Sequence, residues 1–73
     1  MKKTFKMQDL DCANCAAKME AAINKIDGVT EATVNFMAQK LTIDAEDFRF
    51  NEIMQEAIIA CKKVESSCEI VLS

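Results

Sequence analysis

The chain has 73 residues, of which 51% are apolar, with one glycine, no proline and a formal charge of −3. A chain of this length is expected to form a single domain over residues 1–73, with only about 60% of its unfolded surface buried. Acids and lysines are interspersed, so there is no basic stripe for a nucleic acid, and no apolar run fits a signal peptide or a membrane span. We therefore expect a cytoplasmic monomer with no nucleic-acid binding and no membrane insertion.

The first half of the chain passes from strand to helix. Residues 4–8 alternate between apolar and polar side chains, which predicts a strand. Leu10 follows as an apolar plug beneath the next loop. From Ala13 the apolar residues recur at helical spacing, and Asp27 with Gly28 is predicted to end this helix. The side chains expected on its buried face are Cys15, Ala16, Met19, Ala22, Ile23 and Ile26.

The second half begins with two alternating segments, residues 29–36 and 41–45, which predict a hairpin turning at residues 37–39. A second helix follows, with Asp47 or Asn51 as its expected N-cap. Its predicted buried face consists of Phe50, Ile53, Met54, Ala57, Ile58 and Cys61. In a predicted last strand, Cys68, Ile70 and Leu72 alternate with Glu69 and Val71.

This order of elements is strand, helix, strand, strand, helix, strand. It predicts an α+β fold of the ferredoxin-like βαββαβ type, a four-stranded antiparallel sheet with two helices on one face. In that topology three connections share one end of the molecule: residues 12–15, 37–39 and 62–67. Function is expected to be concentrated at this end.

Cys12 and Cys15 lie where the strand period gives way to the helical one. At this spacing two sulfurs can bind one thiophilic metal ion or form a disulfide. In the cytosol the thiols stay reduced, and a helix N-terminus favours the thiolate. Ligation is thus the favoured interpretation, and an exposed pair can pass its ion to another protein's thiolates by ligand exchange.

Asp11 is the residue that distinguishes between metals. Two thiolates suffice for Cu(I), whereas Zn²⁺ prefers four ligands and accepts oxygen readily, as larger divalent ions also do. A carboxylate beside Cys12 can reach an ion held by both sulfurs, and Lys62 or Lys63 could offset the remaining charge. The alternative is that Asp11 only favours the helix N-terminus electrostatically and that the lysines form a solvated helix end.

The other sulfur-containing residues are in phase with apolar positions. Cys61 and Cys68 are predicted to fill the core as small hydrophobic residues, although they fall at the same end as the cysteine loop. Met7, Met19 and Met54 are likewise predicted to be core residues and not ligands.

Three stretches carry a family resemblance: residues 10–20, with Asp11, Cys12 and Cys15, then residues 26–29 and 32–36. They resemble the heavy-metal-associated domain family, which includes copper chaperones and the N-terminal domains of soft-metal P-type ATPases. The family fold is also βαββαβ. The usual loop, Gly-Met-Thr-Cys-x-x-Cys, is replaced here, and aspartate before the first cysteine is similar to the zinc, cadmium and lead branch of these pumps, where this acid is taken as a ligand. The resemblance therefore implies Zn²⁺, Cd²⁺ or Pb²⁺, with Cu⁺ still able to bind.

The leading hypothesis is a metal-binding domain of a zinc/cadmium/lead-exporting P-type ATPase, which binds the ion through Asp11, Cys12 and Cys15. Its partners would be the pump's other domains, or a protein that donates or accepts metal. The chain itself is not expected to be an enzyme. A stand-alone metallochaperone for copper or zinc is the first alternative. A thiol–disulfide oxidoreductase is disfavoured by the absence of proline, and a structural zinc site of all four cysteines by their spacing.

Overall fold

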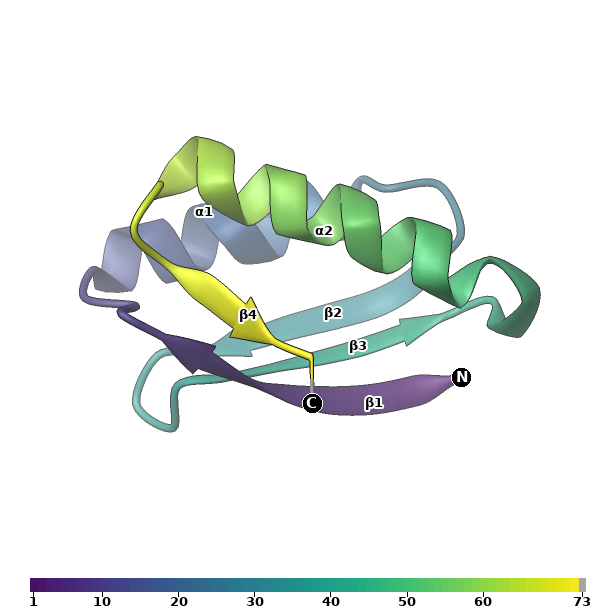
Figure 1. Ribbon diagram of the computed structural model, residues 1–73, viewed down its shortest axis with the longest axis horizontal. Coiled ribbons are helices and arrows are strands. Elements are labelled where there is room, and N and C mark those ends of the chain that lie inside the picture. Colours follow the sequence, from purple (N-terminus) through teal and green to yellow (C-terminus); the bar gives the residue numbers. More distant parts are fainter. Residues whose placement is uncertain (73) are drawn as a thin grey trace.

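In the computed structural model, which describes residues 1–72, four strands form one sheet and two helices cover a single face of it (Figure 1). The strands lie in the order β2-β3-β1-β4, and every neighbouring pair is antiparallel. The ferredoxin-like prediction is confirmed. Within residues 1–72 no helix is long and apolar enough to cross a lipid bilayer. The elements are β1 (Lys2–Gln8), α1 (Ala13–Asn24), β2 (Val29–Asn35), β3 (Lys40–Ala45), η1 (Asp47–Arg49), α2 (Phe50–Val64) and β4 (Glu69–Val71).

The core lies between the sheet and the helices. In β3 alternate residues are buried, as expected for a strand with one face on the core, and Met7 is the buried residue of β1. Met19 of α1 and Met54 of α2 are also buried, so the prediction that these three methionines lie in the core is confirmed. The side chains with no more than 2% of their surface exposed are Met7, Leu10, Met19, Ile23, Leu41, Ile43, Ala45, Ile53, Ala57, Cys61 and Cys68.

The end of α1 differs from the prediction. The helix stops at Asn24 and not at Asp27, because the backbone beyond it tightens into i→i−3 bonds, from Lys25 to Ala22 at 3.2 Å and from Ile26 to Ile23 at 3.1 Å. The Asn24 side chain bonds the backbone of Ala32 in β2, accepting from its N–H and donating to its carbonyl, both at 2.9 Å. Gly28 is still required, since its φ of 98° is a conformation that other residues rarely adopt. A Cβ there would also come within 2.8 Å of Ile53 Cδ1.

The predicted N-cap of the second helix is wrong. The 3₁₀ turn η1 precedes α2, the flanking residue of α2 is Arg49, and neither Asp47 nor Asn51 caps it. Asp47 lies within the turn, where its carboxylate pairs with the Met1 amine at 2.6 Å. The helix therefore starts from the preceding 3₁₀ turn instead of from a side-chain cap.

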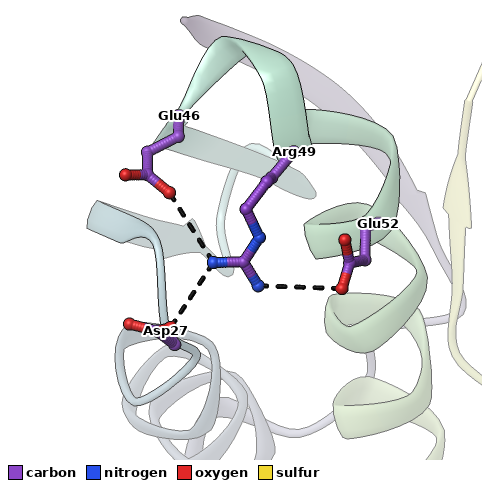
Figure 2. Close-up of polar contacts among 4 residues, drawn as sticks. All are labelled: Asp27, Glu46, Arg49 and Glu52. Atoms are coloured by element: carbon purple, nitrogen blue, oxygen red, sulfur yellow. Dashed lines mark hydrogen bonds and ion pairs between the residues drawn. The ribbon is translucent and has the colours of Figure 1, made fainter.

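Arg49 forms three ion pairs at the end of the molecule opposite the cysteine loop (Figures 1 and 2). Its guanidinium lies 3.4 Å from Asp27, 3.6 Å from Glu46 and 3.7 Å from Glu52. These contacts connect the turn after α1 with the segment between β3 and α2. Partly exposed ion pairs of this kind contribute little individually.

Strand β4 is shorter than predicted and pairs with β1 only opposite Lys6–Gln8. Cys68 is buried and Ile70 packs against the core, as expected. Leu72 lies beyond the last β1–β4 pair and is 52% exposed, although it lines a hollow together with Phe5, Phe50 and Met54. The predicted alternation therefore extends past the end of β4, where the strand no longer covers the side chain.

Candidate metal-binding site

The loop between β1 and α1 is fixed to the tip of the β2–β3 hairpin. The Gln39 side chain accepts a hydrogen bond from the Leu10 N–H at 3.2 Å and donates to the Leu10 carbonyl at 2.7 Å. The Gln39 carbonyl accepts from the Met7 N–H at 2.8 Å, and Leu10 is buried beneath the loop as predicted. The connection from α2 to β4 lies at the same end (Figure 1), so the prediction that three connections share one end is confirmed.

Cys12 is the N-cap of α1. Its backbone is extended, with φ −129° and ψ 118°, and its Sγ accepts a hydrogen bond from the Cys15 N–H at 3.1 Å. Its carbonyl accepts the first helical bond, from Ala16 at 3.0 Å. A sulfur here takes the place of the usual capping oxygen and lies in the positive field of the helix N-terminus. Cys12 and Cys15 are both half-buried and unoxidised, which suits ligands that must be reached from outside.

The two thiols differ in pKa. Hydrogen bonds from the Cys15 thiol and then from the Cys15 backbone N–H lower the pKa of Cys12. The hydrogen bond to Cys12, partial burial and the neighbouring negative charge raise the pKa of Cys15 to about 11. Cys12 is therefore the more readily ionised of the two thiols, and a cation bound by both sulfurs would have to displace the proton of Cys15.

Glu65 is the residue at this end that sequence reasoning missed. Its charge contributes to the raised pKa of Cys15, after the effects of Cys12 and of burial. A hydrogen bond with the Glu65 side chain is the smallest contribution to the raised pKa of Cys15. No other partner is found for the buried Oε2, while Oε1 accepts a weak bond from Ser67 at 3.5 Å. A buried carboxylate oxygen so weakly paired is costly, and it is an oxygen donor near the two sulfurs. The topology had placed residues 62–67 at this end, but only the lysines among them were considered.

Asp11 is exposed in the loop just before Cys12. Burial, followed by the charges of Glu65, Asp9 and Asp11, raises the pKa of Cys68, so Asp11 lies at the same end of the molecule as the buried thiol. Within residues 1–72 no three histidine, cysteine, aspartate or glutamate side chains are already gathered as a metal site. A third ligand therefore requires a side-chain rotation.

Lys62 does not pair with the cysteine loop. Its Nζ donates to the Ser66 carbonyl at 3.1 Å and lies 3.7 Å from Glu69. Lys63 is exposed. Of the two interpretations left open for these lysines, the helix end is the one that the contacts support, with Lys62 joining the end of α2 to the connection that leads to β4.

Cys61 and Cys68 lie in the core, as predicted, with 1% and 0% of their surface exposed. Burial raises the pKa of Cys61 to about 11, with a further contribution from Cys68. These two thiols are thus neutral packing groups with no route to the surface in this conformation.

The chain belongs to the heavy-metal-associated domain family, because the family model matches residues 4–66. Domains of this family bind soft metal ions and are not themselves catalytic. The sequence resemblance and the fold expected from it are thereby confirmed.

The relatives most similar in sequence include two bacterial transporters. A probable cadmium-transporting ATPase of Listeria monocytogenes is 49% identical over 45 residues, which are 62% of this chain. A zinc/cadmium/lead-transporting P-type ATPase of Escherichia coli strain K12 is 39% identical over 44 residues, 60% of this chain. Each match covers only 6% of the relative's length, so this chain is similar to a small part of each transporter.

Solved structures share the fold. The CopZ metallochaperone superimposes with a TM-score of 0.76 at 22% identity, covering 97% of this chain and 100% of that one. The Cu(I)-loaded N-terminal domain of a potential copper-translocating P-type ATPase from Bacillus subtilis gives 0.73 at 27% identity, covering 94% and 84%. Stand-alone chaperones and pump domains therefore have the same architecture.

Proposed function

We propose that this chain is the cytosolic metal-binding domain of a P-type ATPase that exports Zn²⁺, Cd²⁺ or Pb²⁺, and that it forms one unit over residues 1–73. It takes up the ion and passes it to the pump, or reports the metal load to it. Its partners are the pump's other domains or a protein that donates or accepts metal. The observation that carries the proposal is the pair of half-buried sulfurs at a helix N-terminus, with the Glu65 carboxylate close enough to raise the pKa of Cys15.

The proposed ligands are Cys12, Cys15 and Asp11, with Glu65 as a fourth. Two sulfurs and two oxygens complete the tetrahedral set that Zn²⁺ prefers. Asp11 is exposed and can rotate toward the sulfurs, while the weakly paired Oε2 of Glu65 gains a stronger partner when a cation arrives. Cu(I), content with two thiolates, gains little from either carboxylate.

The experiment is a competitive titration of Zn²⁺, Cd²⁺ and Cu(I) on the wild type and on Asp11→Asn and Glu65→Gln. Each substitution is expected to weaken the binding of Zn²⁺ and Cd²⁺ by about tenfold or more, because these ions need oxygen ligands. The affinity for Cu(I) should stay within about threefold, because Cu(I) does not need them. Asp9→Asn and Glu69→Gln are matched controls, since they remove the same charges at the same end. Equal losses for Zn²⁺ and Cu(I) would remove that carboxylate from the ligand set.

X-ray absorption of the loaded protein tests the ligand set directly. Two Zn–S distances near ~2.3 Å with oxygen ligands near ~2.0–2.2 Å are expected. A spectrum with no sulfur ligands, or with four, contradicts the proposal.

A stand-alone metallochaperone is the second candidate. The observation in its favour is that a metallochaperone, CopZ, is covered over its full length by this fold. The length of the encoded protein distinguishes the two candidates, because a pump adds several hundred residues with apolar spans.

A further inference from the structure

A groove of about 410 Å³ lies on the outer side of the helical layer, between α1 and α2. Ala22 and Ile26 of α1 form one wall, and Ile59 and Ala60 of α2 contribute to the other. Ile59 has 54% of its surface exposed although it belongs to a helix that already buries one face on the sheet. Ile59 and Ala60 therefore form a second apolar stripe on α2, in which Ile59 is exposed and Ala60 is only partly buried against the core.

This stripe has a charge at each end. Glu56, Ile59, Ala60 and Lys63 stand at positions i, i+3, i+4 and i+7 of α2, the spacing of one helix face. The two charged residues are about 10 Å apart along the axis at ~1.5 Å per residue. Both line the groove and are exposed, and within residues 1–72 the ion pairs involve neither of them. Along this face of α2 an acidic residue is followed by an apolar one, a small one and a basic one.

We propose that this groove is the interface of a weak homodimer, in which α2 packs antiparallel against α2 of a second copy. A two-fold axis near Ile59 and Ala60 would bring Glu56 of each copy opposite Lys63 of the other. Such a surface is complementary to itself, as an isologous contact requires. An unrelated helix or a small apolar ligand would have no reason to match this arrangement of charges.

The middle of the groove has a shape that suits a second helix. Ala60 and Ala22 are small and permit close approach of backbones, and Ile59 of each copy can enter the groove of the other. The apolar area is small, so the dissociation constant is expected to be weaker than about 1 μM and the dimer to form at high concentration. This association differs from the monomer expected from the sequence, and it is independent of the proposed metal binding.

Sedimentation equilibrium of the reduced, metal-free protein up to about 1 mM tests the proposal. The wild type is expected to show dimer at the highest concentrations. Glu56→Lys and Lys63→Glu are each expected to weaken association at least about tenfold, because each places like charges opposite one another. The double variant Glu56→Lys/Lys63→Glu restores opposite charges and should recover the wild-type constant.

Mixing the two single variants gives the sharpest result. Glu56→Lys carries a positive charge at both ends of the stripe, and Lys63→Glu carries a negative charge at both ends. An equimolar mixture should therefore associate more strongly than either variant alone. A wild type that stays monomeric at about 1 mM, or variants that all associate equally, would overturn the proposal and leave the groove to another partner. Unchanged Cd²⁺ titrations of the variants control for correct folding.

Discussion

The two cysteine pairs of this chain have the same chemistry in different surroundings. Cys12 and Cys15 are half-buried at a helix N-terminus, where hydrogen bonds lower the pKa of Cys12. Cys61 and Cys68 are sealed in the core, where burial raises the pKa of both. The comparison teaches that position in the fold, and not residue type, separates the proposed ligands from the packing groups.

The largest expected effect comes from removing a sulfur of the first pair. Cys12→Ser or Cys15→Ser should weaken Cd²⁺ binding by more than about 100-fold, since even the outer partners of ligands are worth about 10–100-fold. Competitive chelator titration measures it. Cys61→Ala and Cys68→Ala are the matched controls and should retain affinity within about threefold. If the core variants lose binding instead, the assignment of the two pairs is reversed.

The second pair is expected to show the reverse pattern in stability. Cys68→Ser should lower the free energy of unfolding by about 1–3 kcal/mol, because it buries a hydroxyl group in an apolar core. Cys12→Ser should change it by less than about 0.5 kcal/mol, since a serine oxygen is also a good N-cap. Urea denaturation of metal-free protein checks both values. Equal losses at the two positions would contradict the comparison.

Alkaline pH should weaken the fold through the buried thiols. The pKa of Cys61 is raised from 9.0 to about 11, so the folded state holds the proton more tightly than the unfolded state. The stabilisation is complete below about pH 9 and is lost as the pH rises through 11. In Cys61→Ala the fall in unfolding free energy over this range should be shallower. Superimposable pH curves for the two proteins would rule out this contribution.

The smallest expected effect concerns the two ends of the molecule. Gln39→Ala removes both hydrogen bonds to Leu10 and should cost about 1 kcal/mol, together with a few-fold loss of Cd²⁺ affinity through a looser loop. Arg49→Ala disrupts the opposite end, shown in Figure 2, and should cost no more than about 1 kcal/mol. Its Cd²⁺ affinity should be unchanged. A loss of affinity in Arg49→Ala as large as in Gln39→Ala would argue against a local effect of the loop.

The sequence by itself determined the elements, their faces and the cysteine loop. Alternation in β3, helical spacing in α1 and the change of period at Cys12 are local patterns, and local patterns follow from backbone geometry. The order of the elements also predicted that three connections lie at one end of the molecule. Leu10 and the core position of Cys68 were predicted in the same way.

Only the tertiary structure decided what depends on contacts between distant residues. Asn24 bonds the backbone of Ala32 in β2, and Glu20 accepts from the Val34 N–H at 2.8 Å. Glu65 joins the cysteine loop from the far end of the chain. Such hydrogen bonds and buried oxygens leave no periodic trace in the sequence, because their partners are set by packing and not by spacing along the chain.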